Sequence, residues 1–95
     1  MYARITTFQA DPSKLDAIEK MTDSIREQLK KVSGLTACYT CVNESGSGVT
    51  VAVYESQEHA DRGSDQTRAI WASLASLLTA PPNIQTYDNV TDLKA

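Results

Sequence analysis

Two neighbouring segments of this 95-residue chain carry no charged side chain on either face of the strands that they predict. Residues 35–42 and 49–54 are rich in residue types that favour strands. The short Gly/Ser-rich loop between them predicts an antiparallel hairpin. A sheet that is covered by helices on one face and by water on the other alternates apolar with strongly polar residues. These two strands do not alternate in this way, so we expect both faces of the sheet to be covered.

The segment before the hairpin predicts a strand followed by a long helix. Residues 2–10 alternate between two strand faces: Tyr2, Arg4, Thr6 and Phe8 share one face, and Ala3, Ile5 and Thr7 share the other. Asp11 caps the helix, Pro12 is its first residue, and Gly34 stops it. The apolar stripe of the helix recurs at spacings of three and four: Leu15, Ile18, Thr22, Ile25, Leu29 and Val32.

The segment after the hairpin predicts two helices and a last strand. A short helix over residues 57–62 is broken by Gly63, and a longer one runs over residues 64–79 until a pair of prolines ends it. The last strand covers residues 84–90. The order strand, helix, strand, strand, helix, strand predicts an α+β fold of the ferredoxin-like type, βαββαβ, with a four-stranded antiparallel sheet and both helices on one face.

The size of the chain and its uncovered sheet face both favour self-association. A chain of this length buries roughly 60 to 68% of the surface that its unfolded form exposes, so it gains from self-association. Because the helices cover one sheet face, the simplest cover for the other is the same face of a second chain in an isologous homodimer. The alternative is a monomer with a mildly apolar exposed sheet.

Other partners are disfavoured. The net charge of -3 argues against nucleic acid, which basic surfaces bind. No stretch approaches the ~20 apolar residues that span a membrane, and the N-terminus shows no apolar signal segment. The expected location is therefore the cytoplasm.

Cys38 and Cys41 form a C-x-x-C string, which can indicate a redox pair or half of a zinc site. On a strand, positions three apart lie about 10 Å from each other and point to opposite faces, beyond the reach of a disulfide. A zinc site would need two further ligands, and the chain has one histidine and no other cysteine. We expect two free thiols, buried or interfacial, and no metal site.

The chain also carries short motifs of a known family, and their order matters more than any one of them. The first strand ends in Phe-Gln-Ala-Asp-Pro-Ser-Lys over residues 8–14, Gly34-Leu35 opens the second strand, and Val-Tyr-Glu-Ser-Gln-Glu-His-Ala occupies residues 53–60. This pattern resembles the dimeric α/β-barrel superfamily, and within it the antibiotic biosynthesis monooxygenase-like domains. The resemblance covers residues 1–90, which we expect to form one domain, with a short polar tail over residues 91–95. It implies a dimeric barrel with a pocket between helices and sheet.

The resemblance implies a range of activities. Some members oxidise aromatic polyketides without metal or flavin, because a deprotonated phenol or anthrone itself supplies electrons to oxygen. The protein then supplies orientation, a proton acceptor and exclusion of water. Haem-degrading members use an Asn, a Trp and a His at positions that correspond here to Thr6, the neighbourhood of Gly63 and the neighbourhood of Trp71. None of the three is kept, so we expect neither haem nor any other cofactor.

Two residues are candidates for catalysis. His59 is the only histidine, and its unperturbed pKa near neutrality makes it the first choice for a general base. Its place beside Glu58 and Asp61 also suits a solvated surface position. Thr6 occupies the position at which the family places a polar pocket residue.

Four residues are candidates for binding a substrate. Phe8, Tyr54 and Trp71 could form the aromatic walls of a pocket for a planar molecule, although Trp71 equally suits a packed core. Arg4 shares the strand face of Thr6 and Phe8 and could bind an anionic group, or form an ion pair at the rim. The facing of Tyr39 and Tyr87 depends on strand register and stays open.

These observations predict a cofactor-independent, monooxygenase-like protein that binds a hydrophobic or aromatic small molecule in a helix–sheet pocket. The alternative is a non-catalytic metabolite-binding or regulatory dimeric module of the same fold, which the scarcity of titratable groups favours. An isomerase- or lyase-like activity would need a buried acid–base pair, which the sequence does not reveal.

Overall fold

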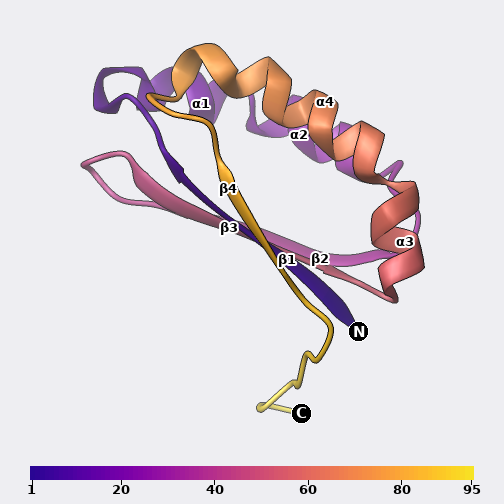
Figure 1. Ribbon diagram of the computed structural model, residues 1–95. Coiled ribbons are helices and arrows are strands. Elements are labelled where there is room, and N and C mark those ends of the chain that lie inside the picture. The colour runs from indigo at the N-terminus through magenta and orange to yellow at the C-terminus, as the bar shows by residue number, and fades with distance from the viewer.

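The computed structural model describes residues 1–95 and contains one four-stranded sheet with every helix on the same side (Figure 1). The strands are β1 (Tyr2–Gln9), β2 (Leu35–Val42), β3 (Ser47–Tyr54) and β4 (Asn83–Tyr87). Their order across the sheet is β2-β3-β1-β4, and each neighbouring pair is antiparallel. The predicted α+β, ferredoxin-like fold is confirmed.

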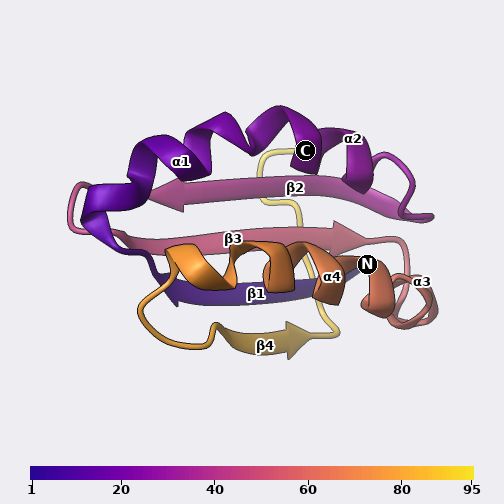
Figure 2. The same ribbon diagram turned by 90° about the horizontal axis from the view of Figure 1, so that it is seen from above.

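The helices form a layer over one face of the sheet and leave the other face bare. Viewed from above, α1 and α2 run beside β2, while α4 runs over the other half of the sheet (Figure 2). Their bounds, including two short 3-10 helices, are η1 (Pro12–Lys14), α1 (Leu15–Lys20), α2 (Thr22–Leu29), α3 (Gln57–Arg62), α4 (Ser64–Leu74) and η2 (Ala75–Leu77). No helix combines the length and the apolar character needed to cross a membrane.

The single long helix predicted before the hairpin is wrong in detail. It is interrupted at Met21, whose N–H bonds three residues back to the carbonyl of Ile18 at 3.0 Å and so tightens the turn. It also ends at Leu29, because the next turn is again tightened, and Gly34 then takes a positive φ of 79°. The apolar side chains keep their common face through the break.

Two other predicted boundaries also shift. The helix predicted to reach residue 79 ends at Leu74 and continues only as the 3-10 turn η2. The last strand ends at Tyr87 rather than at residue 90. The chain beyond β4 leaves the sheet on the side away from the helices (Figure 1).

A polar side chain within the loop stabilises the turn of the β2–β3 hairpin. The Asn43 side-chain oxygen accepts from the backbone N–H groups of Ser45 at 3.1 Å and Ser47 at 3.2 Å. Gly46 takes a positive φ of 87°, and its carbonyl accepts from the N–H of Ala10 at 2.7 Å. This bond fastens the turn to the end of β1.

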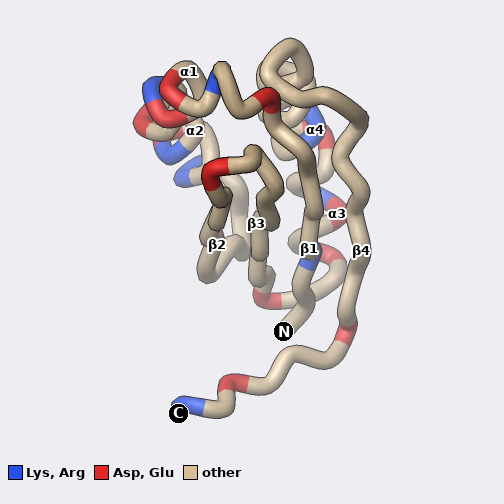
Figure 3. The backbone as a smooth tube through the Cα atoms, turned by 90° about the vertical axis from the view of Figure 1, so that its left-hand side faces the viewer, with Lys and Arg blue, Asp and Glu red and all other residues tan.

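Each strand presents alternate residues to the two faces of the sheet. The helix face of β1 carries the predicted set that includes Arg4, Thr6 and Phe8. The opposite face, called here the open face, consists of Ala3, Ile5, Thr7, Ala37, Tyr39, Cys41, Val49, Val51, Val53, Gln85 and Tyr87. It contains no charged residue, and charge gathers instead on the helices and loops (Figure 3).

Candidate functional site

A cavity of about 540 Å³ lies between the helices and the sheet. Its floor is the helix face of all four strands, and its main floor residues are Arg4, Thr6, Phe8, Cys38, Thr40, Thr50, Ala52, Tyr54, Ile84 and Thr86. The sequence prediction of a helix–sheet pocket rested on the family resemblance, and the structure contains such a space. Its size falls within the range typical of small-molecule sites.

The roof of the cavity is the apolar side of the helices. The predicted stripe of the first helix contributes Ile18, Thr22, Ile25 and Leu29, and α4 contributes Ile70, Trp71 and Leu74. Most of these roof side chains are only half buried, since they face the cavity rather than a packed core. The side chains predicted as an apolar stripe thus form a wall of the cavity.

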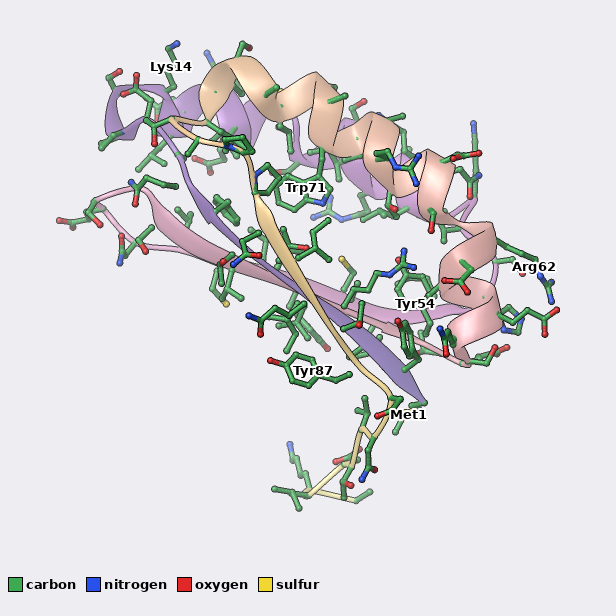
Figure 4. The ribbon with its side chains drawn as sticks, viewed as in Figure 1. Met1, Lys14, Tyr54, Arg62, Trp71 and Tyr87 are labelled. Carbon is green, nitrogen blue, oxygen red and sulfur yellow. The ribbon has the colours of Figure 1, made fainter.

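Aromatic side chains close one end of the cavity. The rings of Phe8 on β1 and Trp71 on α4 lie with their centroids 5.6 Å apart and their planes tilted by 54°. Trp71 occupies the space between α4 and the sheet (Figure 4). The Phe8 ring also lies directly over Gly48, where a Cβ atom would clash with it. A planar ligand in this end would meet aromatic surface from the floor and the roof.

Arg4 occupies the opposite end, next to α3. Its Nη1 donates to the Ala60 carbonyl at 3.1 Å and to the Ser64 hydroxyl at 3.0 Å, and its Nη2 pairs with an Asp61 carboxylate oxygen at 3.0 Å. Its guanidinium carbon lies 6.0 Å from the centre of the Tyr54 ring. The structure therefore combines both sequence readings of Arg4, as a cavity residue and as a member of an ion pair.

Two buried hydroxyls on the floor have no partner within the protein. Thr6 is 5% exposed and Tyr54 is 1% exposed, and both line the cavity. No side-chain oxygen or nitrogen that is sealed from solvent lacks a hydrogen bond, so these hydroxyls reach the cavity space. Buried polar groups are nearly always hydrogen-bonded, and polar atoms of a ligand in the cavity could accept from each of them.

Burial keeps the titratable floor residues neutral. It raises the pKa of the Tyr54 phenol above its ordinary value, and the Cys38 thiol acts in the same direction, while the positive charge of Arg4 opposes both. Burial likewise raises the pKa of the Cys38 thiol. At neutral pH Tyr54 is therefore a hydrogen-bond donor, and Cys38 is a weakly nucleophilic thiol.

His59 lies outside the cavity. Its Nδ1 is 2.8 Å from the Ser56 hydroxyl, its Nε2 is 3.5 Å from a Glu55 carboxylate oxygen, and its ring packs against Gly34. Ser56 is the N-cap of α3, so these contacts hold the start of that helix. The catalytic role of His59 stays a prediction, and its position does not support it.

The structure brings together the other five predicted site residues, Arg4, Thr6, Phe8, Tyr54 and Trp71, around one cavity. Sequence analysis missed two lining residues that carry chemistry, Cys38 and Arg68. Arg68 precedes Trp71 by three residues, so helical spacing could have placed it on the same face. Cys41 lies exposed on the open face, and both cysteines are free thiols, as expected from a strand. No group of three His, Cys, Asp or Glu side chains is arranged to hold a metal ion.

Comparisons with known proteins rest on structure alone. No family model matches the sequence, and no curated protein matches it either. Rv0793 from Mycobacterium tuberculosis superposes with a TM-score of 0.75 over 97% of both chains, at 21% identity. A candidate antibiotic biosynthesis monooxygenase from Caulobacter crescentus superposes with a TM-score of 0.78. The match covers 95% of this chain and 90% of that chain, at 20% identity. The chain has the antibiotic biosynthesis monooxygenase-like fold.

A third similar structure contains a ligand. The monooxygenase from the gene ActVA-Orf6 of Streptomyces coelicolor, solved in complex with nanaomycin D, has a TM-score of 0.75 and 22% identity. The match covers 97% of this chain and 89% of that one. At these identities the likeness establishes the fold, and it confirms the resemblance predicted from the sequence at that level.

Proposed function

We propose that the cavity binds a planar, hydrophobic or aromatic small molecule and that the protein oxidises this molecule with oxygen without a cofactor. The cavity itself carries the proposal: about 540 Å³ of mostly apolar space with an aromatic pair at one end and unpaired hydroxyls on its floor. Apolar walls with a few placed polar groups are typical of sites for small organic molecules.

The similar structures support the oxidative part. Two of them are named as monooxygenases or candidates for that activity, and one binds nanaomycin D. The cavity of this chain lies between its helices and its sheet. The specific reaction nevertheless has to be argued from the residues present here, because one fold hosts several chemistries.

The floor residues suit a substrate that reacts as its own anion. An anthrone-type molecule would lie against the Phe8–Trp71 pair, with its oxygen accepting a hydrogen bond from a floor hydroxyl, that of Thr6 or that of Tyr54. The positive charge of Arg4 favours the ionised substrate, which releases its proton to water at the rim. Oxygen then takes the electrons of that anion: the methylene carbon keeps one oxygen atom as a carbonyl, and the other leaves as water with the remaining methylene hydrogen and one proton taken up from solvent. The roof helices exclude water from the ring.

The open face supports a second element of the proposal, a homodimer. Its eleven residues carry no charge and include Tyr39, which is 67% exposed, and Tyr87, which is 45% exposed. Tyr87 projects on the side of the sheet away from the helices (Figure 4). A second copy packed through the same face would bury this surface symmetrically. The two free thiols fit a reducing compartment such as the cytoplasm.

One observation favours the non-catalytic alternative. The residues that line the cavity include no histidine and no carboxylate, so the cavity offers no side chain that would act as a base near neutral pH. If the ligand does not ionise readily by itself, the same site serves to bind a metabolite without changing it. The oxidative proposal therefore requires a substrate with an acidic C–H or O–H group.

Oxygen consumption tests the proposal. The purified protein is supplied with anthrone- and quinol-type compounds in air, with metal chelator present and flavin absent. We expect consumption of one oxygen per anthrone, above the spontaneous rate. The control is Ala52→Phe, whose ring would occupy the cavity while leaving the protein surface unchanged. Binding without oxygen consumption across the panel would support the metabolite-binding alternative, and absence of binding would overturn both.

A further inference from the structure

The charged residues that line the cavity are both positive. They are Arg4 and Arg68, and no aspartate, glutamate or lysine joins them. The chain as a whole carries a net charge of -3. A cleft whose charges oppose the sign of the whole protein concentrates positive potential where an anion would enter.

Both arginines lie at the same end of the cavity. Arg4 reaches from β1 to the hydroxyl of Ser64 at the start of α4. Arg68 follows Ser64 by four residues, so the two residues lie one above the other on the same side of that helix. Thr67 lies on this side of α4 too, and all of these residues line the cavity.

Arg4 is held in place but keeps free donors. Its three hydrogen bonds engage Nη1 and one N–H of Nη2, which leaves Nε–H and the second N–H of Nη2 without an acceptor. Its ion-pair partner Asp61 has a side chain that is 60% exposed, against 19% for Arg4. Asp61 therefore faces solvent, and its carboxylate engages a single N–H of Arg4.

Arg68 is available as a second cation. Its contact with protein is a 3.5 Å hydrogen bond to Asp65, with side chains that are 76% and 94% exposed, and such surface pairs are weak. Buried Tyr54, whose ring centre lies 6.0 Å from the guanidinium carbon of Arg4, adds a neutral donor. Together these groups form a site with spare donors and spare positive charge.

We infer that the ligand of this cavity is an aromatic acid, whose carboxylate binds at the Arg4 and Arg68 end while its planar rings lie toward Phe8 and Trp71. Arg4 and Phe8 are four residues apart on one strand, which places their Cα atoms about 13 Å apart. A molecule of two or three fused rings with one carboxylate spans this length. The inference rests on the proposed small-molecule function and specifies the class of ligand.

Two matched probes test the inference: anthraquinone-2-carboxylate and the neutral 2-(hydroxymethyl)anthraquinone. Trp71 is the only tryptophan, so its fluorescence reports binding in the cavity directly. We expect the carboxylate to bind at least about tenfold more tightly, since hydrogen bonds to charged groups are the stronger ones. The preference should shrink as salt is raised, because the Arg68 end is exposed.

Arg68→Gln identifies the source of the preference without disturbing the buried contacts of Arg4. It should reduce the ratio of the two affinities severalfold and leave the neutral probe unaffected. The matched control is Arg26→Gln, which removes an arginine with the same spacing to its ion-pair partner, Asp23, but lies outside the cavity. Arg26→Gln should keep the wild-type ratio.

The outcomes separate the two claims. Equal binding of both probes to the wild type overturns the inference and leaves the proposed function standing. An equal fall in the ratio for Arg68→Gln and Arg26→Gln overturns it too, because general charge would then explain the preference. If neither probe binds, the proposed function fails and the inference fails with it.

Discussion

The two faces of this sheet are built from alternate residues of the same strands, yet they differ in how they are covered. The helices cover the helix face, but a cavity of about 540 Å³ lies between them and the sheet. It is lined by Thr6, Tyr54 and aromatic rings. No helix covers the open face, although it displays valines and tyrosines and no charge. One face therefore lines a cavity beneath the helices, whereas no helix covers the other.

In the proposed function, a chain of 95 residues uses one sheet for both ligand binding and association. Adjacent residues such as Val51 and Ala52 point to opposite faces. A change at one of them should affect association, and a change at the next should affect ligand binding. Paired substitutions at neighbouring positions can therefore test the two faces separately.

Val51→Asp should produce the largest effect. Val51 lies in the middle of the open face, between Ile5 on β1 and Tyr39 on β2. In a homodimer the new carboxylate would be buried without a partner, which costs about 3 to 5 kcal/mol. We expect light scattering coupled to size exclusion to change from a dimer to a monomer at micromolar concentration.

The control for Val51→Asp is Gln66→Asp, which adds the same charge on the exposed side of α4. It should leave the dimer intact. A wild type that already runs as a monomer near 10.4 kDa would contradict the proposed dimer directly.

Ala52→Phe should affect the other face and leave association alone. Its ring would project into the cavity, so the anthraquinone probes should lose measurable binding. Because the space already exists, the free energy of unfolding should change by no more than about 1 kcal/mol, less than the ~1–3 kcal/mol that overpacking costs in a filled core. Calorimetry and chemical denaturation measure the two quantities. Binding that survives Ala52→Phe would place the ligand elsewhere.

Most of the fold could be predicted because it follows two sequence periodicities, the alternation of strand residues and the three-to-four spacing of helix residues. Alternation assigned Arg4, Thr6 and Phe8 to one face of β1, and helical spacing assigned Ile18, Ile25 and Leu29 to one side of the first helix. The break at Met21 could not be predicted in this way. A tightened turn keeps the apolar side chains on the same side, so it leaves no mark in the spacing of the sequence.

The site was predictable where its residues follow those periodicities, and unpredictable where they do not. Cys38 was missed because the register of β2 shifts between Leu35 and Ala37, which puts Leu35 and Cys38 on the same face although they are three residues apart. His59 was chosen for its chemistry, and the type of a residue does not determine the direction of its side chain. Its ring instead fills the space that Gly34 leaves open.

A smaller effect, confined to the helix face, should appear at alkaline pH. Burial raises the pKa of Tyr54 from its ordinary value of 10.0. The folded protein therefore retains the phenol proton at a pH at which the unfolded chain has lost it. This contribution to stability is complete below pH 10 or so and is lost as the pH rises through the higher folded value.

Denaturation at a series of pH values above neutrality measures this contribution. The free energy of unfolding of the wild type should fall more steeply above pH ~10 than that of Tyr54→Phe, which has no phenol to titrate. Tyr39→Phe on the open face is the control, since its side chain is exposed in the monomer and the experiment can be run on the Val51→Asp background. Parallel curves for the wild type and Tyr54→Phe would contradict the buried, neutral phenol.

The smallest effect on function should come from His59→Gln, because His59 belongs to neither face. Its side chain holds the start of α3 through Ser56 and contacts no part of the cavity. Losing that hydrogen bond should cost about 1 kcal/mol of stability, and Ser56→Ala should cost a similar amount by removing the same contact and the helix cap. Probe affinity and any oxygen consumption should stay within about twofold of the wild type, since a change of this size is below 1 kcal/mol. If turnover disappears in His59→Gln while probe binding and Ser56→Ala activity persist, His59 is a catalytic base after all, and α3 must move toward the cavity during the reaction.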